Sequence, residues 1–305
     1  MSEIINTGLL EAGLKSDFFN RLNATPTLFQ NVSTRIPSTM PSEKYRWLGT
    51  VPNMRQWVDG RQAKGLRSEA YDVTNLKYEA TLAVDRDEID DDQTGQIRIR
   101  INELAQRAAT HKDFLLGQLL ENGGTAGFNS YDGVSFFNDA HVSGASGNQD
   151  NNLTSAAADG TQPTTAEMRA ALALAVAAMM GFKDDQGSPM SISMGGLICM
   201  VPVNYVWVAM EALQAAIISQ TSNVMVGAAQ VVVNPWLTSQ DRFYMIKTDG
   251  VIRPFIFQDR APIEFGSKAE GSEHAFDNEK YLYGVRARYA LTYGYWQYCV
   301  RHIFT

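Results

Sequence analysis

The sequence predicts an α+β fold, because helical and strand patterns come in separate blocks and do not alternate as in a doubly wound sheet. Three features carry this prediction: a long helical pattern over residues 94–121, a second, capped helix after Thr164, and a strongly alternating segment over residues 281–304. A chain of 305 residues, 45% hydrophobic and 19% charged, is long enough to bury a sizeable core. One large unit or two intimately joined units are therefore expected.

The first 43 residues are expected to form an N-terminal arm. A short helical pattern of Ile4, Leu9, Leu14 and Phe18 gives way to residues 25–44, which are rich in proline, serine and threonine. This composition is typical of an extended segment, so few core contacts are expected there.

Residues 44–84 are expected to form a long projecting hairpin. Its second strand is indicated by residues that alternate with Glu79, Thr81 and Ala83, namely Tyr78, Ala80, Leu82 and Val84. The stretch over residues 47–67 is too long for a tight turn, and long loops in compact proteins are usually functional. Residues 43–77 contain seven basic and four acidic side chains, so the projection is positive on a negative protein.

Residues 94–121 show the longest helical pattern. Apolar side chains recur along one stripe, with His111 filling one place: Ile97, Ile101, Leu104, Ala108, Leu115 and Leu119. Such a helix would be about 40 Å long at a rise of 1.5 Å per residue. Gly95 and Gly117 each weaken it by about 1 kcal/mol relative to alanine, so packing must hold it in place.

An acidic cluster directly precedes this helix. It consists of Asp85, Asp87, Glu88, Asp90, Asp91 and Asp92. Its carboxylates complement the positive end of the helix dipole, and Asp92 or Thr94 is the expected N-cap.

The second half of the chain predicts shorter elements. Residues 122–164 indicate a loop with one strand-like island at 131–141, and Thr164 with Glu167 forms a capping box for a helix that ends at Gly181. After a buried strand at 197–201, Asn204 is expected to cap a further helix. Three strands then follow (230–235, 242–247 and 253–258), and the last alternating segment is expected to bend near Tyr293 and Gly294.

The sequence offers little that points to catalysis. The motifs of phosphate-binding loops, dinucleotide sites, zinc proteases and α/β-hydrolases are absent from it. Asp139 and His141 could form a catalytic or metal pair, but a lone Asp-x-His is weak evidence. The acidic cluster lacks the glycine and the closing glutamate of an EF-hand, so a surface that docks a basic partner is favoured over a cation site. We therefore expect no enzymatic activity, cofactor or metal ion.

Several other reactive or aromatic residues are expected to be structural. His111 is interpreted as a packed or interface histidine, and Cys199 and Cys299 as buried thiols in a reducing compartment. The tyrosines of the last segment could stack on bases, but cross-strand packing is favoured.

Charge and hydropathy bound the location. A net charge of −7 and a pI of about 5.2 disfavour tight nucleic-acid binding. The first residues do not resemble a signal peptide, and the longest mostly apolar stretch, 172–180, is about half of a membrane span. We expect a protein of the cytoplasm, or of a particle assembled there, with no membrane partner.

Five blocks of the sequence resemble the Mu-like phage major head protein family. They are YRWLGTVPNMRQWVDGR (45–61), YEATLAVDRDEIDDDQTG (78–95), YDGVSFFNDAHV (131–142, followed by QDNN), TSNVMVGAAQVVVNPWL (221–237) and YGVRARYALTYGYWQ (283–297). The blocks keep their order and approximate spacing over roughly residues 40–300. The resemblance is therefore more specific than any one motif.

This resemblance implies the HK-97-like phage capsid fold and a shell-forming function. The implied parts are an N-terminal arm (1–43), an extended loop over the adjacent subunit (44–84), a peripheral domain with the long spine helix (85–164), an axial domain (165–255) and a return to the peripheral domain (256–305). The implied partners are the protein itself as hexamers and pentamers, scaffold, portal and decoration proteins, and loosely contacted packaged double-stranded DNA. The implied location is the virion, assembled in the host cytoplasm.

Contacts between subunits are expected to join the positive loop to the acidic cluster. The loop would contribute Trp47, Trp57 and Leu66 as apolar anchors and Arg55, Arg61, Lys64 and Arg67 as charges. The acidic surface would consist of Asp85, Asp87, Glu88, Asp90, Asp91 and Asp92. Two alternatives stay open: an encapsulin-like compartment that shares the fold, and a metal-dependent hydrolase built on Asp139, His141 and the acidic cluster.

Overall fold

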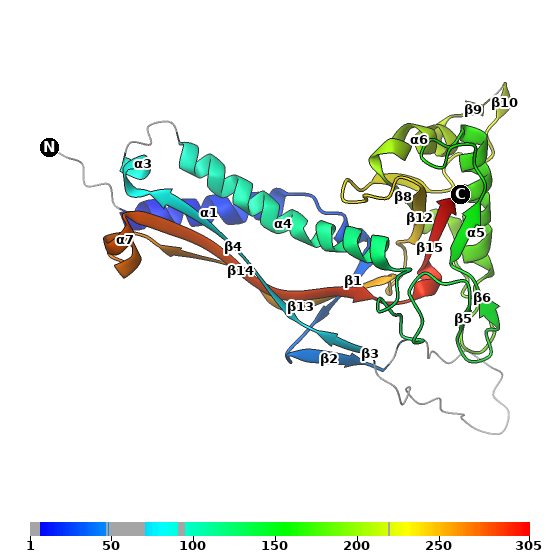
Figure 1. The fold of residues 1–305 in the computed structure, drawn as a ribbon, viewed down its shortest axis with the longest axis horizontal. Helices are drawn as coiled ribbons and strands as arrows, with labels where there is room; N and C mark the ends of the chain where they lie inside the picture. Colours follow the sequence, from blue (N-terminus) through cyan, green and yellow to red (C-terminus); the bar gives the residue numbers. More distant parts are fainter. Residues whose placement is uncertain (1–6, 47, 49–70, 91–94, 219) are drawn as a thin grey trace.

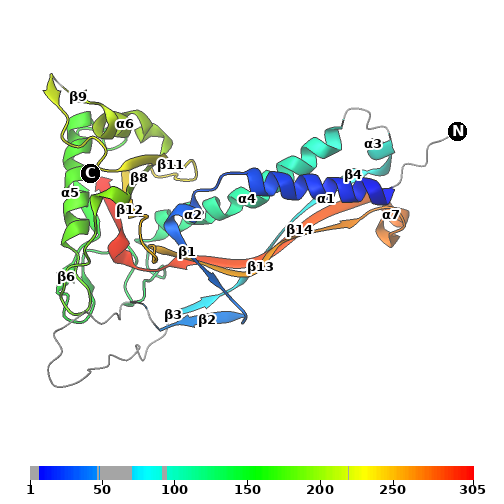
Figure 2. The same cartoon turned by 180° about the vertical axis from the view of Figure 1, so that it is seen from behind.

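The structure is a computed structural model that describes residues 7–46, 48, 71–90, 95–218 and 220–305. These residues form an elongated part with a compact part at one end of it (Figures 1 and 2). Helices and strands follow in blocks along the chain, which confirms the α+β prediction.

A four-stranded sheet runs along the elongated part. Its order is β1 (Ser33–Pro37), β13 (Phe255–Lys268), β14 (Lys280–Tyr293) and β4 (Leu76–Asp85). β1 is parallel to β13, and the other pairs are antiparallel. The alternation predicted for the last segment is confirmed, because residues 281, 283, 285, 287 and 289 are buried and Arg286 is exposed.

Helix α4 (Gln96–Asn122) crosses this sheet as the long helix predicted for 94–121. Its N-cap is Gly95 at φ 72°, a left-handed conformation that glycine adopts without steric cost. The expected caps Asp92 and Thr94 lie outside the described residues. The most buried positions include Ala105, Ala109, Leu116 and Leu120, one residue after those of the predicted stripe. The adjacent residues of the predicted stripe are only partly buried: Leu104, Ala108, Leu115 and Leu119. A second helix and the compact part also cover α4, so the buried side of the helix is not confined to that stripe.

The N-terminal segment is docked on the body, which corrects the prediction of an arm with few core contacts. Helix α1 (Thr7–Ala24) packs along α4 and buries Leu14 and Phe18. Arg98 Nη2 donates to Asp17 Oδ1 at 2.7 Å across the two helices. α2 (Phe29–Val32) enters the main core, and β1 joins the sheet. The polar composition of this segment led to the wrong expectation, because its few apolar residues are enough to anchor it.

A short antiparallel pair closes the base of the predicted hairpin. β2 (Ser42–Tyr45) pairs with β3 (Tyr71–Thr74), which brings the two ends of the loop together. The loop residues named for subunit contacts (Trp47, Arg55, Trp57, Arg61, Lys64, Leu66 and Arg67) lie outside the described residues.

The compact part is built on a five-stranded sheet. Its order is β11 (Gln230–Val233), β8 (Leu197–Val201), β12 (Arg242–Lys247), β15 (Cys299–Phe304) and β7 (Asn152–Ser155). α5 (Thr165–Gly181) and α6 (Val206–Gln214) pack on each other and against this sheet. The capping box of Thr164 and Glu167 is present as predicted.

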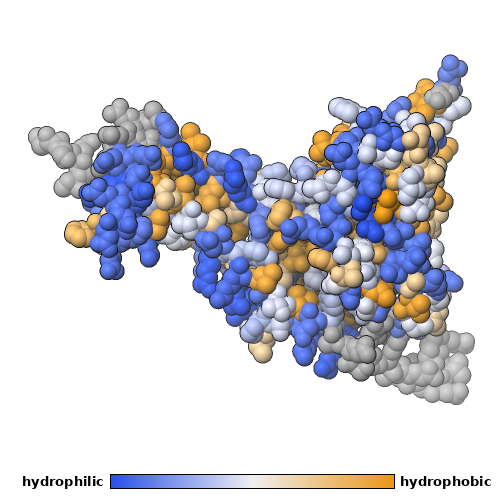
Figure 3. All heavy atoms as spheres, in the orientation of Figure 1, coloured by the Kyte–Doolittle hydropathy of each residue, from blue (hydrophilic) through white to orange (hydrophobic). Residues whose placement is uncertain are grey.

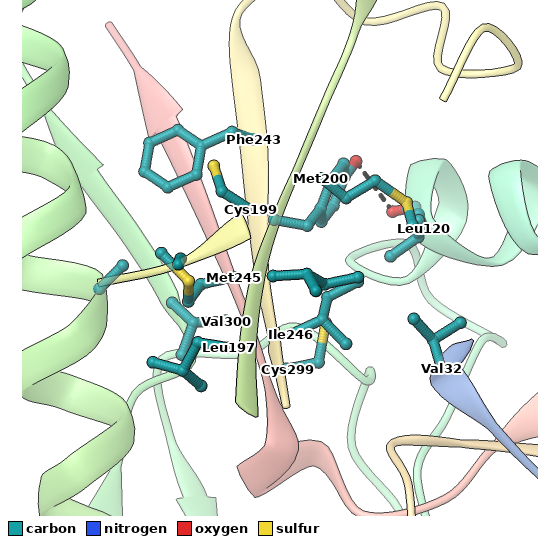
Figure 4. Packing of buried hydrophobic residues seen from close by; sticks show 14 of the residues in the cluster. Val32, Leu120, Leu197, Cys199, Met200, Phe243, Met245, Ile246, Cys299 and Val300 are labelled. Atoms are coloured by element: carbon teal, nitrogen blue, oxygen red, sulfur yellow. Dashed lines mark hydrogen bonds between the residues drawn. The ribbon is translucent and has the colours of Figure 1, made fainter. Parts of the chain in front are cut away.

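The main core lies on both faces of this sheet (Figure 4). Leu197, Phe243 and Val300 point toward α5, whereas Met200 and Ile246 point toward Leu120 of α4 and Val32. Alternate residues of each strand thus fill the two layers. The end of α4 and the residues of α2 belong to this core, so the two parts of the molecule share it.

The chain passes from one part to the other at the predicted bend. β14 ends at Tyr293, the 3-10 turn η3 (Trp296–Tyr298) follows, and β15 lies in the five-stranded sheet. The expectation that residues 256–305 all return to the peripheral part is therefore wrong for β15. Its partners, β12 and β7, are set by tertiary pairing that the local sequence pattern does not contain.

Three smaller features complete the fold. β7 lies within the region predicted as loop, together with the short pair β5 (His141–Val142) and β6 (Asn148–Gln149). The prediction that Asn204 caps α6 is wrong, since its side chain donates to the carbonyls of Thr161 and Gln240. Tyr205, at the end of η2 (Val203–Tyr205), is the N-cap residue. η1 (Met194–Gly196) leads into β8.

Candidate assembly surfaces

The described part of the acidic cluster lies at the far end of the elongated part. β4 ends at Asp85, and helix α3 (Arg86–Asp90) follows it. Ile89 is buried in the core beneath, which turns Asp85, Asp87 and Glu88 toward solvent. The side chain of Asp90 and all of Asp91 and Asp92 lie outside the described residues.

A second acidic segment, missed by the sequence analysis, lies beside α3. It carries Glu270, Glu273, Asp277 and Glu279, all exposed, around helix α7 (Glu273–Asn278). Arg86 fixes the two segments together. Its backbone N–H donates to the Glu279 carbonyl at 2.9 Å, and its guanidinium lies 3.7 Å from Glu270 Oε1. We call the seven carboxylates Asp85, Asp87, Glu88, Glu270, Glu273, Asp277 and Glu279 the acidic tip.

The acidic tip also exposes one aromatic side chain. The Ser272 side chain accepts from the Ala275 N–H and caps α7, and Ala275 packs into the core. Phe276, on the opposite side, is left 89% exposed. Figure 3 shows hydrophilic residues gathered over this end of the molecule. Phe276 is thus an exposed apolar side chain that lies next in sequence to the carboxylate of Asp277.

A different surface occupies the far end of the compact part. Five large apolar side chains are exposed around α6 and the pair β9 (Ile217–Ile218) and β10 (Thr221–Ser222): Val203, Trp207, Ile217, Val224 and Val226. We call these five residues the apolar apex. Ala209, Ala212 and Leu213 bury the other side of α6, so Trp207, 78% exposed, faces away from the core. The loop after β10 is fixed by Asn223, whose amide donates to the carbonyls of Ala212 and Ala215.

Asp139 and His141, which the sequence left open as a weak candidate pair, do not contact each other through their side chains. His141 is fully buried, with Nδ1 2.6 Å from Asp132 Oδ2 and Nε2 3.2 Å from the Phe136 carbonyl. Its ring stacks on Trp296 at 4.1 Å, whereas Asp139 is exposed. His141 therefore fastens the loop of residues 128–151 to the bend before β15. Within the described ranges, no group of three or more metal-ligating side chains occurs.

The remaining candidate residues are packed, as predicted. His111 Nδ1 lies 2.7 Å from the Tyr289 hydroxyl, and burial lowers the pKa of this histidine. Cys199 and Cys299 are free and buried, and burial raises the pKa of both thiols. The aromatic residues of the last segment belong to the cores, which excludes a base-stacking platform for Tyr281, Tyr283, Tyr289, Tyr293, Tyr295 and Trp296.

A long sheet crossed by a spine helix and joined to a compact sheet-and-helix part is the HK-97-like capsid fold, the architecture of subunits that build phage shells. A chain of the procapsid of bacteriophage JBD30 has this fold, with a TM-score of 0.59 and 24% identity over 98% of this chain and 75% of that one. A chain of the virus-like particle from Pyrococcus furiosus shares it too, with a TM-score of 0.55 and 9% identity over 95% of this chain and 97% of that one.

The chain belongs to the Mu-like prophage major head subunit gpT family, whose model matches residues 8–168, 164–237 and 238–303. The major capsid protein of Escherichia phage Mu is 23% identical over 287 residues, which is 94% of this chain and 70% of that protein. The protein is thus a major capsid subunit of a tailed-phage head. No helix in the described ranges has the length and apolar character of a membrane span.

Proposed function

We propose that this subunit assembles in the host cytoplasm into hexamers and pentamers, which close into an icosahedral head around double-stranded DNA, and that it catalyses no reaction. The supporting observation is that two unlike exposed surfaces, the apolar apex and the acidic tip, lie at opposite ends of one subunit. A subunit with two separated contact surfaces can bind copies of itself at both ends and so extend a lattice.

The compact part is assigned as the axial domain, built from residues 165–255 together with β7 and β15. Its apolar apex would meet the copies around each capsomer axis. Full burial of one large apolar side chain stabilises a contact by about 1.5–3 kcal/mol, so Trp207 and its neighbours would provide most of the strength there.

The acidic tip is proposed to receive the positive loop of a neighbouring subunit. The basic residues Arg55, Arg61, Lys64 and Arg67 of that loop are opposite in charge to the tip, and Trp57 and Leu66 would supply apolar contacts. An exposed ion pair contributes about 0–1 kcal/mol, so charge sets the register of the contact while apolar area gives it strength. Repetition over the whole shell makes such modest contacts sufficient.

Further partners follow from the function. A scaffold protein, a portal and a decoration protein are proposed partners of the shell, and the packaged DNA is proposed to be touched only loosely. The net charge of −7 supports loose contact, because a strong DNA binder carries a basic surface.

The fold alone leaves an encapsulin-like compartment open, because a virus-like particle shares it. The match to the Mu-like head family over nearly the whole chain favours the phage head. The two functions differ in their contents, since a phage head packages DNA and a compartment holds a cargo enzyme.

Negative-stain electron microscopy of the chain expressed with its neighbouring scaffold gene tests the proposal. Closed, uniform shells with hexamers and pentamers are expected. If the chain of about 33.7 kDa stays monomeric with and without scaffold, the proposal is wrong.

Charge reversal tests the proposed contact between loop and tip. A triple variant of Arg61, Lys64 and Arg67 to glutamate, or of Asp87, Glu88 and Asp277 to lysine, should fold but fail to close shells. Combining both triples should restore closure, because opposite charges again face each other. Asp139→Lys, an exposed acid outside the tip, is the matched control and should assemble normally. Normal shells from both triples would contradict the contact.

A further inference from the structure

The sheet edges in the described part of the chain differ in how well they are protected. β7 and β11 have only four residues each, and β1 has five and ends at Pro37. The part of β13 beyond β1 carries Pro262 and two breaks of register. Short edges, prolines and bulges all prevent a further strand from pairing.

β4 has none of these protections. Its ten residues contain no proline and pair with β14 in unbroken register from Leu76 to Asp85. In the described structure, the backbone of these residues makes no other hydrogen bond to backbone, and most of its side chains are exposed. A long, regular, unpaired edge is a template for another strand.

We propose that β4 pairs antiparallel with β4 of a second copy across a two-fold axis at Thr81, joining the two four-stranded sheets. The inference rests on the proposed function, because a shell presents many copies of the chain to one another. A two-fold contact uses the same strand on both sides, so β4 must be complementary to itself.

The charges on β4 select this register. With Thr81 on the axis, Lys77 lies opposite Asp85 at both ends of the pair, and Glu79 lies opposite Ala83. An axis at Glu79 would place that carboxylate opposite itself, and an axis at Leu82 would place Glu79 opposite Asp85 twice. An axis at Ala80 brings no charges together. An axis at Tyr78 would oppose Lys77 and Glu79 but would pair only residues 76–80 of the strand, whereas the axis at Thr81 pairs residues 77–85. Opposite charges across strands stabilise a pair and like charges destabilise it.

Side-chain packing agrees with the same register. If the two-fold axis passed between two adjacent residues of β4, the apolar side chains of one strand would lie opposite the polar side chains of the other. With the axis at Thr81, the partner's Leu82 lies opposite Ala80, and the partner's Val84 lies opposite Tyr78. Tyr78 and Ala80 line a cavity of about 210 Å³ between β4 and α4, which also contacts Ala108. The small Ala80 leaves apolar space beside it for a larger side chain from the second copy.

A Thr81→Cys variant, oxidised after shell assembly, tests the pairing. Opposed residues in an antiparallel pair have Cα atoms about 4.5–5.5 Å apart, within the range of a disulfide. Ala83→Cys is the control, because two copies of residue 83 would lie about 13 Å apart along the strands at 3.3 Å per residue. The native Cys199 and Cys299 are fully buried and do not compete.

Non-reducing electrophoresis should show a disulfide-linked dimer for Thr81→Cys shells and monomer for Ala83→Cys shells. Closed Thr81→Cys shells without dimer would overturn the strand pairing and leave the proposed function intact. A dimer from Ala83→Cys alone, or capture of a different protein at position 81, would overturn it as well. If even the unmodified chain forms no shells, the proposed function itself fails.

A charge swap tests the register independently of cysteine chemistry. Lys77→Asp and Asp85→Lys should each reduce shell yield several-fold, because each creates two like-charge pairs across the axis. The double variant should recover the yield, since it restores two opposite-charge pairs. No recovery in the double variant, with both single variants folded, would overturn this register.

Discussion

Asp113 is expected to hold the N-terminal segment on the spine helix. One carboxylate oxygen of this buried residue accepts two backbone N–H groups, from Leu28 at 2.9 Å and from Phe29 at 2.8 Å. These are the first N–H groups around α2, which places Phe29 and Val32 in the main core. We predict that Asp113→Ala detaches this segment, because both N–H groups lose their acceptor.

The magnitude follows from the two hydrogen bonds. A hydrogen bond to a charged group contributes about 1.5–3 kcal/mol, and a buried donor left without a partner costs about 1–3 kcal/mol. Part of this is offset, because burial raises the pKa of Asp113 despite the lowering effect of the Phe29 and Leu28 N–H groups. The ionised carboxylate is thus disfavoured in the fold. We expect Asp113→Ala to lower the free energy of unfolding by about 2–4 kcal/mol.

Asp113→Asn is the matched variant, since its amide oxygen can accept the same two N–H groups without a buried charge. It should stay within about 1 kcal/mol of the parent. Because the pKa of Asp113 is raised, the folded state binds a proton at this residue more tightly than the unfolded state does. The contribution of Asp113 to stability therefore falls as pH rises through its folded-state pKa. The Asn variant should lack this contribution.

Urea unfolding of the unassembled subunit, with limited proteolysis of residues 25–37, measures both effects. Asp113→Ala should shift the midpoint and expose new cleavage sites in this segment. An Ala variant as stable and as resistant as the parent would refute the reasoning. If Asn were as damaging as Ala, the charge and not the hydrogen bonds would be responsible.

Two further predictions concern packing and pH. Burial lowers the pKa of His302 to about 4, and neither of its ring nitrogens has a hydrogen-bond partner. The unfolded chain protonates this histidine at a higher pH than the folded chain does. The free energy of unfolding should therefore fall by about 3 kcal/mol as pH drops from about 6.5 to 4. His302→Phe should lose this part of the pH dependence in denaturation curves. At Gly117, an added Cβ would lie 2.7 Å from Trp236 Cβ. Gly117→Ala should therefore cost about 1–3 kcal/mol of overpacking, which outweighs about 1 kcal/mol of helix propensity. Gly13→Ala, where an added Cβ would meet no atom within 4 Å, should be neutral or stabilising. Thermal unfolding of both glycine variants measures the difference.

Local patterns in the sequence predicted the elements that local physics controls. The spacing of Ile97 and Ile101 reports the periodicity of α4, and Thr164 with Glu167 satisfies the first N–H groups of α5 within a few residues. The alternation along β14 and its end at Tyr293 follow from the same kind of short-range constraint. The acidic cluster was visible because its six residues lie within the short stretch 85–92.

Contacts between distant segments were not predictable in this way. The sequence contains Glu270 and Glu273, but only the pairing of β4 with β14 and the contacts of Arg86 bring them beside Asp85. The same holds for His141, whose partner is Asp132 and not the nearby Asp139.

The sequence by itself determined the α+β class, the main helices, the alternating last strand and the family of the protein. Tertiary structure alone decided that α1 and β1 dock on the body and that β15 leaves the long sheet. It also decided that the outer edge of β4 has no strand partner among the described residues. The physical reason is the distance along the chain over which each kind of interaction acts. Periodicity and capping act within a few residues, whereas strand order and docking depend on apolar burial and backbone pairing summed over the whole chain.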